Sequence, residues 1–305
     1  MPILFAIILD ICLGDPPNRF HPTAWMGNLI ALLSRFRPYN CPAAELAYGG
    51  LLMLISLTLI LGIGLGLDYL FSHLPLPLNW LLTAMVLKTT FSLRGLDRAA
   101  GEVQSALEQN DLPKARHLLS WHLVSRDTSQ LSEDQVVGAT IESIAENASD
   151  SLLAPLFFFI VGGLPLALAY RFANTADAML GYHDLEHEWF GKIPARLDDF
   201  LNFIPARLTG LFLVCAAAII GNASAKKSMK IMLRDAHLTS SPNAGFPMSA
   251  MAGAISVELE KVDHYRLGAG LNKPQIANLR QARRLYILTA GLIVLVFTPL
   301  AYFFR

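Results

Sequence analysis

Apolar residues run along this chain in long stretches that are separated by shorter polar segments. A bilayer core is crossed by about 20 consecutive apolar residues in a helix. Residues 46–67 and 285–304 meet that length without a charged residue. We therefore predict a membrane-spanning helix in each of these two stretches.

Three weaker apolar stretches complete the pattern. Residues 152–170 are interrupted by Gly162-Gly163-Leu164-Pro165, residues 208–223 are short, and residues 77–87 end at Lys88. The last stretch spans only if Lys88 snorkels or faces protein. The broken stretch could form a re-entrant hairpin, because irregular backbone is tolerated at membrane depth where protein buries it. The short stretch would then also return without crossing.

The polar segments read as helices too. Ser132-Glu133-Asp134-Gln135 fits a capping box, which predicts a long helix from about Glu133 towards Asp150. No sustained two-residue alternation indicates a strand. The expected fold is all-α: a polytopic integral membrane protein, one domain over residues 1–305, with helical insertions at about 94–151 and 224–284.

Composition and charge support this class. Hydrophobic residues make up 53% of the 305 residues and charged residues 16%, against roughly 25% in an ordinary soluble domain. Mean hydropathy is +0.43, which rules out a disordered chain. Lys and Arg number 24 and so do Asp and Glu, so no net field attracts nucleic acid. Basic residues gather in both helical insertions, which predicts that the insertions are cytoplasmic.

Three acidic residues recur at one helical face. Glu142, Glu146 and Asp150 are four apart, with Asn147 beside them. Such like charges repel unless a cation or a base sits among them. A magnesium or phosphate-metal site would explain them, because Mg²⁺ prefers carboxylate oxygens. A solvated helix face explains the spacing equally well.

A second polar group lies between residues 171 and 207. Asn174 and Asp177 are three apart, and Arg196, Asp198, Asp199 and Arg207 follow. Interfacial anchoring is the simple explanation. We favour a functional one, because acids, amides and arginines gather there at one depth.

Other motifs are less specific. Residues 241–247, with Asn243, form a turn-rich loop. Asp10 and Asp15 flank an apolar run and could reach a shared site, whereas a lone His21 is more often structural.

His183 to His187 matches the H-x-x-E-H zinc pattern, but flanking glycines favour a loop and no third ligand is evident. The glycines at 62, 64 and 66 favour close helix packing over nucleotide binding.

Together these motifs resemble the CobD/CbiB cobalamin-biosynthesis family, in order from residue 9 to about residue 270. The residues that carry the resemblance are Leu-Asp-x-x-Leu-Gly-Asp-Pro-Pro with His-Pro (9–22), Arg-Asp-Thr-Ser-Gln-Leu (126–131), Glu-Ser-Ile-Ala-Glu-Asn (142–147), Ala-Pro-Leu-Phe (154–157), Asn-Thr-Ala-Asp (174–177) with Gly-Tyr (181–182), Ala-Arg-Leu-Asp-Asp (195–199), Ile-Pro-Ala-Arg (204–207) and Ser-Pro-Asn-Ala-Gly (241–245). Several of these motifs are six or more residues long, so the resemblance is specific.

The resemblance implies the adenosylcobinamide-phosphate synthase step of cobalamin biosynthesis. ATP would drive an amide bond between the free propionate of adenosylcobyric acid and aminopropanol or its phosphate. Such an enzyme would be an acid–amine ligase of the inner membrane, with its active site facing the cytoplasm. A non-enzymatic, AmpE-like membrane sensor is the alternative. A zinc membrane peptidase is a third class.

Roles for individual residues follow from their chemistry. Carboxylates suit Mg²⁺ binding and base work: Glu142, Glu146 and Asp150, with Asp177 as a further catalytic candidate and Asp198 and Asp199 as rivals. Guanidinium groups suit phosphate: Arg126, Arg196 and Arg207. Amides could orient the substrate: Asn147, Asn174 and Asn243.

Overall fold

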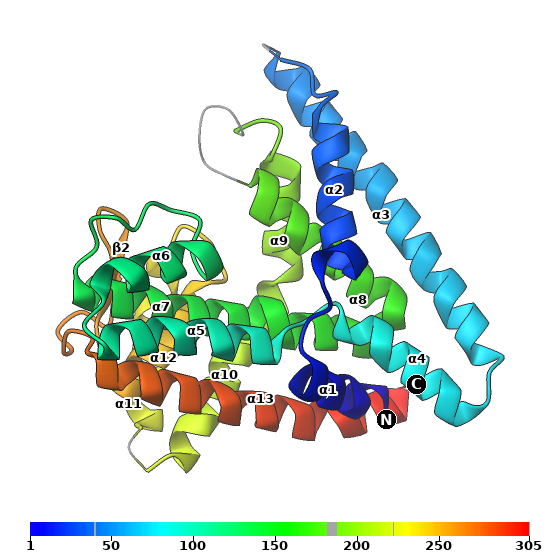
Figure 1. The fold of residues 1–305 in the computed structure, drawn as a ribbon. Helices are drawn as coiled ribbons and strands as arrows, with labels where there is room; N and C mark the ends of the chain where they lie inside the picture. The colour runs from blue at the N-terminus through cyan, green and yellow to red at the C-terminus, as the bar shows by residue number, and fades with distance from the viewer. Residues whose placement is uncertain (40, 182–187, 222, 305) are drawn as a thin grey trace. The chain divides into compact units, whose positions relative to one another are not determined.

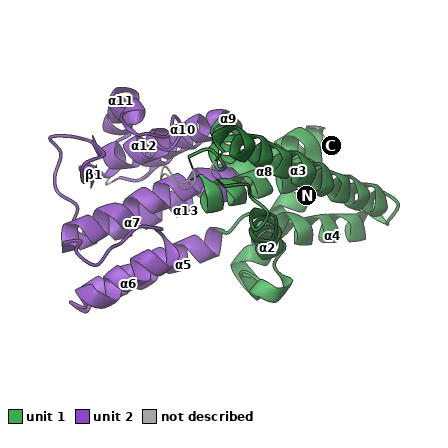
Figure 2. Ribbon diagram, turned by 90° about the horizontal axis from the view of Figure 1, so that it is seen from above, with its two compact units in different colours: residues 1–92, 154–202, 296–305 green, residues 93–153, 203–295 purple. Residues whose placement is uncertain are grey.

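The computed structural model describes residues 1–39, 41–181, 188–221 and 223–304, and it is nearly all helical (Figure 1). The chain divides into two compact units (Figure 2). Unit 1 holds residues 1–92, 154–202 and 296–305, and unit 2 holds residues 93–153 and 203–295. Whether the units belong to a single domain stays a prediction.

Unit 1 is built from apolar helices around a long central pair. Its elements are α1 (Pro2–Leu13), the 3₁₀ turn η1 (Asn18–Phe20), α2 (Pro22–Ser34), α3 (Pro42–Ser72), α4 (Leu76–Lys88), α8 (Ala154–Leu180) and α9 (Lys192–Leu201). Helices α3 and α8 pack together, α9 contacts both of them, and α2 contacts α8. Met26, Leu52 and Phe172 belong to the buried core that these helices share.

Helix α8 is kinked where the sequence predicts a break. Gly162 (φ −152°, ψ 23°) and Gly163 (φ 73°, ψ −157°) leave the helical region, and Pro165 follows. A positive φ is readily adopted by glycine, which has no Cβ to clash. The interruption of the apolar run is therefore confirmed, while re-entry into the membrane stays a prediction.

Unit 2 combines shorter amphipathic helices with a small hairpin. Its elements are α5 (Leu93–Glu108), α6 (Leu112–His122), α7 (Glu133–Ala148), the π-helical turn η2 (Ser149–Leu153), α10 (Phe203–Ile219), α11 (Ala225–Asp235), the 3₁₀ turn η3 (Ala236–Leu238), α12 (Gly245–Ile255), β1 (Leu259–Lys261), β2 (Tyr265–Leu267) and α13 (Ile276–Phe304), whose last residues belong to unit 1. Helix α7 contacts α5, α6, α12 and β1.

The start of α7 confirms the predicted capping box. The backbone N–H of Ser132 donates to Gln135 Oε1 at 2.9 Å, and the Ser132 side chain completes the reciprocal pair. Glu133 and Asp134 place negative charge in the first turn, where it interacts favourably with the positive end of the helix dipole. The helix runs to Ala148 and passes into the π-helical turn, so its length is also as predicted.

Three helical runs are long and apolar enough to cross a membrane. They are α3, the continuous run 133–180 and α13, and the pair α9 and α10 makes a fourth if it is counted as one broken span. Both strong spans of the sequence lie within these helices. The chain therefore has the make-up of a multi-pass membrane protein. Helix α4, with 13 residues, is shorter than a span, and the residues of the zinc pattern at 183–187 lie outside the described part.

Candidate active site

The acidic face of α7 centres on a buried carboxylate. Glu142 is only 5% exposed, and its Oε2 lies 3.7 Å from Arg126 Nη2. Its other oxygen, Oε1, is buried and has no hydrogen-bond partner within the described part of the chain. A buried acceptor without a partner carries a desolvation penalty, and such a group calls for a proton, a cation or a substrate donor.

The hairpin brings further charge to this carboxylate. Burial raises the pKa of the Tyr265 phenol, and the nearby charges of Glu142 and Glu146 raise that pKa further. The phenol therefore stays protonated near neutral pH and can serve as a donor. Lys261, on the other strand, adds positive charge near Glu142. Strands β1 and β2 are antiparallel and place Lys261 opposite Tyr265.

A cavity of about 360 Å³ opens beside this cluster. Arg126, Lys261 and His264 line it, together with Gln135 and the acids Asp127 and Glu260. The sequence analysis identified Arg126 but missed Lys261, His264 and Tyr265. A basic residue and a tyrosine in an otherwise ordinary loop carry no signal until the hairpin folds against α7.

The third acid, Asp150, lies in the π-helical turn rather than in α7. A π turn contains more residues than an α turn, so a spacing of four no longer guarantees a shared face there. The neighbouring Asn147 holds the local backbone: its Nδ2 donates to Ser143 O at 3.0 Å, and its Oδ1 accepts from Ser151 at 2.9 Å. The described residues include no group of three or more His, Cys, Asp or Glu side chains arranged to bind a metal ion.

Arg207 and Asn243 meet elsewhere in unit 2. Arg207 Nη1 donates to Asn243 Oδ1 at 3.2 Å and to Phe203 O at 2.6 Å. The guanidinium also lies over the rings of Phe203 and Phe246, 3.6 Å and 4.2 Å from their centroids. Cation–π contacts on two rings and two hydrogen bonds hold this arginine in place.

Unit 1 contains a separate network around Asp198. Asn174 Nδ2 and Asn202 Nδ2 donate to its two oxygens at 3.3 Å and 2.9 Å. Tyr170 donates to Asn202 Oδ1 at 2.9 Å, and Arg171 donates to Asn174 Oδ1 at 3.4 Å. Asp198 is 8% exposed. The network joins α8 to α9 and brings Asn174 next to Asp198, while their functional roles stay a prediction.

The remaining candidates of unit 1 are Asp177, Arg196 and Asp199. Asp177 is half-buried, and its carboxylate occupies the space that a Cβ on Gly181 would need, 2.1 Å from Oδ1. Asp199 is half-buried, and Arg196 is exposed on α9. These three residues belong to unit 1, whereas the acids of α7 belong to unit 2. A shared role for the two groups of residues therefore stays a prediction.

The acids near the start of the chain do share a site, as the sequence allowed. Lys88 Nζ lies 3.1 Å from Asp10 Oδ1 and also pairs with Asp15. Asp10 is fully buried and Lys88 is 5% exposed, so the lysine faces protein. Burial alone would raise the pKa of Asp15, but contacts with His21, Lys88 and Ser92 outweigh it and hold that pKa below its usual range. His21 itself caps α2 by accepting from Thr23 N at 3.2 Å.

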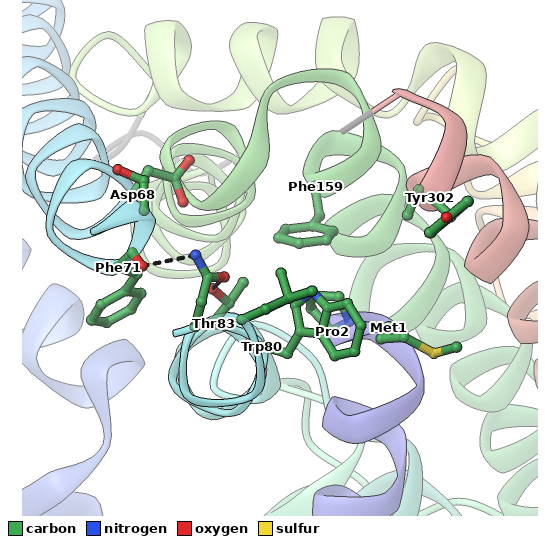
Figure 3. Close-up of a pocket in the computed structure, with 12 residues that line it drawn as sticks. Met1, Pro2, Asp68, Phe71, Trp80, Thr83, Phe159 and Tyr302 are labelled. Atoms are coloured by element: carbon green, nitrogen blue, oxygen red, sulfur yellow. Dashed lines mark hydrogen bonds between the residues drawn. The ribbon is translucent and has the colours of Figure 1, made fainter. Parts of the chain in front are cut away.

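Unit 1 also has a cavity of about 560 Å³ (Figure 3). Trp80 and Phe159 face it, with Asp68 near one side, and the dashed line marks the bond from Asn79 Nδ2 to Phe71 O at 2.8 Å. None of the described residues that line it is Lys, Arg or His. The cavity of unit 2 is therefore the better match to an anionic substrate.

These features define a polytopic helical membrane protein with a buried acid beside a cavity that Arg126 and Lys261 line. Sequence comparison identifies the group within that class. The family model described as CobD/Cbib protein matches residues 3–290, so the chain belongs to the CobD/CbiB family.

Similar proteins agree with this assignment. The chain is 43% identical to "Probable cobalamin biosynthesis protein CobD" of Methanothermobacter thermautotrophicus, over 87% of this chain and 86% of that protein. It is 40% identical to "Cobalamin biosynthesis protein CobD" of Dehalococcoides mccartyi, over 99% and 97%. It is 36% identical to "Cobalamin biosynthesis protein CbiB" of Salmonella typhi, over 90% and 86%. No solved structure matches the chain.

Proposed function

We propose that this protein is an ATP-dependent acid–amine ligase of cobalamin biosynthesis. It joins aminopropanol or its phosphate to the free propionate of adenosylcobyric acid and forms adenosylcobinamide or its phosphate. Membership of the CobD/CbiB family supports a biosynthetic enzyme over an AmpE-like sensor. The observation that carries the proposal is the buried Glu142, whose Oε1 has no partner among the described residues, next to a cavity that Arg126 and Lys261 line.

The reaction needs an activated carboxylate. A propionate oxygen attacks the γ-phosphorus of ATP, the bond to ADP breaks, and an acyl phosphate forms. The neutral amine then attacks the acyl carbon, inorganic phosphate leaves, and the nitrogen loses a proton. Arg126 and Lys261 would balance the negative charge that develops on the phosphoryl group. A carboxylate of α7 would accept the amine proton.

Mg²⁺ fits this site on the evidence of its donors. Magnesium usually binds one or two protein carboxylates, with water and substrate phosphates completing its shell. Glu142 offers a buried oxygen without a partner in the described chain, and Glu146 is one turn away. These two residues would hold the ion, and Asp150 would be its outer neighbour. When bound, Mg²⁺ reduces the charge on the transferred phosphoryl group.

The position of the active site follows from the orientation of the chain. Adenosylcobyric acid and ATP would reach unit 2 directly from the cytoplasm, at the cytoplasmic surface of the inner membrane. The basic residues of segments 94–151 and 224–284 support that orientation.

Substitution of the acids tests the proposal. We expect Glu146→Gln and Glu142→Gln to lower ATP-dependent amide formation about a hundredfold or more, because each removes charge that would bind the metal or the proton. The assay measures cobinamide phosphate formed from adenosylcobyrate, ATP and aminopropanol phosphate in membranes with equal amounts of each protein. Glu133→Gln, in the exposed first turn of the same helix, is the matched control.

Activity within twofold of the parent in both variants would rule out a catalytic or metal-binding role for Glu142 and Glu146. It would also shift the assignment to Asp177, Asp198 and Asp199. Growth of a deletion strain provides the test in cells. Growth on cobinamide but not on cobyric acid places the block at this step, and growth on both contradicts the proposal.

A further inference from the structure

Two cationic side chains and a histidine converge on the cavity of unit 2 from two distant parts of the sequence. Arg126 comes from the loop between α6 and α7, and Lys261 and His264 come from the β1–β2 hairpin. Asp263, between them, has a φ of 62°, so the hairpin turns tightly at this point. The fold of the hairpin, together with its packing on α7, therefore determines where Lys261 and His264 lie.

The acids in the same wall already have partners. Asp127 accepts hydrogen bonds from Ser129 N at 2.9 Å and from Ser129 Oγ at 3.0 Å. Glu260 accepts from Arg266 Nη2 at 2.7 Å. Both acids therefore keep their charge, and they are held by donors, Ser129 and Arg266, that do not line the cavity.

Arg126 links the cavity to the buried acid of α7. Its Nη2 lies 3.7 Å from Glu142 Oε2, which is longer than a hydrogen bond. A guanidinium at that distance keeps donors for a second anion, and its planar fork suits phosphate oxygens. A phosphate in the cavity would therefore lie close to the carboxylate whose Oε1 has no partner in the described chain.

We propose that Arg126, Lys261 and His264 form a phosphate-binding subsite, and that the β1–β2 hairpin is the element that builds it. The ligand is a phosphate ester or anhydride of the reaction: a phosphate of ATP, or the phosphate of the phosphorylated amine. The identity of these ligands rests on the proposed function. The subsite itself rests on the cavity and its charges.

Equilibrium binding to the purified full-length protein tests the subsite. Calorimetry measures the affinity for ATP, for aminopropanol phosphate and for unphosphorylated aminopropanol. The main variant is Lys261→Gln, and the second is His264→Gln. Lys273→Gln is the matched control, because Lys273 is 86% exposed, lies outside the cavity lining and pairs with Asp134 at 3.6 Å. Equal thermal unfolding midpoints establish that the variants are folded.

We expect Lys261→Gln to weaken binding of one phosphate-bearing ligand about tenfold, because it removes a charge-assisted contact. Loss for ATP alone identifies the nucleotide as occupant, and loss for aminopropanol phosphate alone identifies the amine ester. Aminopropanol binding and the control variant should stay within twofold of the parent. Unchanged affinity for both phosphate ligands in the Lys261 and His264 variants overturns the subsite.

The proposed function fails by a different result. If the parent protein binds neither ATP nor aminopropanol phosphate and forms no amide, the ligase assignment is wrong. If the parent forms amide and Lys261→Gln binds both phosphate ligands normally, the ligase assignment stands and the subsite lies elsewhere.

Discussion

At the scale of single residues, Asp235 shows how unit 2 uses a buried charge. It is 2% exposed at the end of α11, and its Oδ2 accepts from the backbone N–H of Gly268 at 2.6 Å. Arg234 donates to both of its oxygens. Burial would raise the pKa of Asp235, but the bonds from Arg234 and Gly268 outweigh it and lower that pKa.

The lowered pKa predicts a pH-dependent contribution to stability. A carboxylate with a lowered pKa in the fold stabilises above its unfolded pKa, and that stability is lost as pH falls through the folded pKa. We expect Asp235→Asn to lower the free energy of unfolding at pH 7 by about 1–3 kcal/mol. The deficit should shrink below about pH 4.

Thermal unfolding in detergent at several pH values measures this effect. Asp263→Asn, at an exposed turn position, is the control and should behave as the parent. A deficit that stays constant from pH 7 to pH 3 would contradict the assigned role of the charge.

Single residues also mark how far the sequence could predict the site. Helical spacing was enough to place Glu142 and Glu146 one turn apart, because the period of a helix is fixed. For Asn174 and Asp198 the sequence showed only that polar residues are dense between residues 171 and 207, and the hydrogen bond between the two side chains depends on how α8 and α9 pack. Lys261 and Tyr265 could not be predicted from the sequence, because their approach to Glu142 depends on the tertiary folding of residues far along the chain.

At the scale of elements, three glycines of α3 differ in how closely a neighbouring helix approaches them. A Cβ on Gly64 would lie 2.5 Å from Pro165 Cα, so α3 and α8 approach closely at this position. A Cβ on Gly62 or Gly66 would meet no described atom within 4 Å. The glycines at 62, 64 and 66 thus include one packing residue, in line with the interpretation of this segment as a packed span.

This contrast predicts opposite outcomes for three similar substitutions. Gly64→Ala should destabilise the protein by about 1–3 kcal/mol, because the added methyl overlaps rigid backbone. Gly62→Ala and Gly66→Ala should be neutral or slightly stabilising, because alanine favours helix. Unfolding midpoints of the three variants in the same detergent decide the matter. Equal effects of all three would mean that α3 and α8 are farther apart.

Elements were the most predictable level of this structure. Long apolar runs fix the existence of α3 and the end of α13, and a local cap fixes the start of α7. The hairpin was missed because strands of three residues are too short for alternation to register. The π-helical turn was missed because nothing in residue type distinguishes it from the α-helix it follows.

At the scale of the whole molecule, orientation in the membrane is the main prediction. Basic residues in segments 94–151 and 224–284 predict that these segments are cytoplasmic, and residues 68–76, which lack Lys and Arg, should face outward. A label in segment 94–151 needs an exposed position, and Lys114 is exposed whereas its neighbour Ala115 is fully buried.

Cysteine labelling measures this orientation. Cys12, Cys41 and Cys215 are all exposed and must first be replaced. An impermeant reagent should then label His73→Cys in intact cells, and Lys114→Cys only after the cells are permeabilised. The reverse pattern would invert the topology. We also predict that residues 172–206 lie on the cytoplasmic side, and labelling of a cysteine at Arg196 would decide this.

The pairing of Asp10 with Lys88 has a consequence for how the chain is made. Asp10 is fully buried in the folded chain, and a buried carboxylate without a partner carries a large desolvation penalty. Helix α1 leaves the ribosome well before Lys88, so Asp10 lacks its lysine while the first helices emerge. The earliest helix should therefore take its final position late, when α4 arrives. With Cys12 and Cys41 replaced by serine, a cysteine at the buried position Ala6 should react with a water-soluble thiol reagent in a chain stopped after residue 72. A chain stopped after residue 92 contains α4, which packs on α1, and should protect that cysteine.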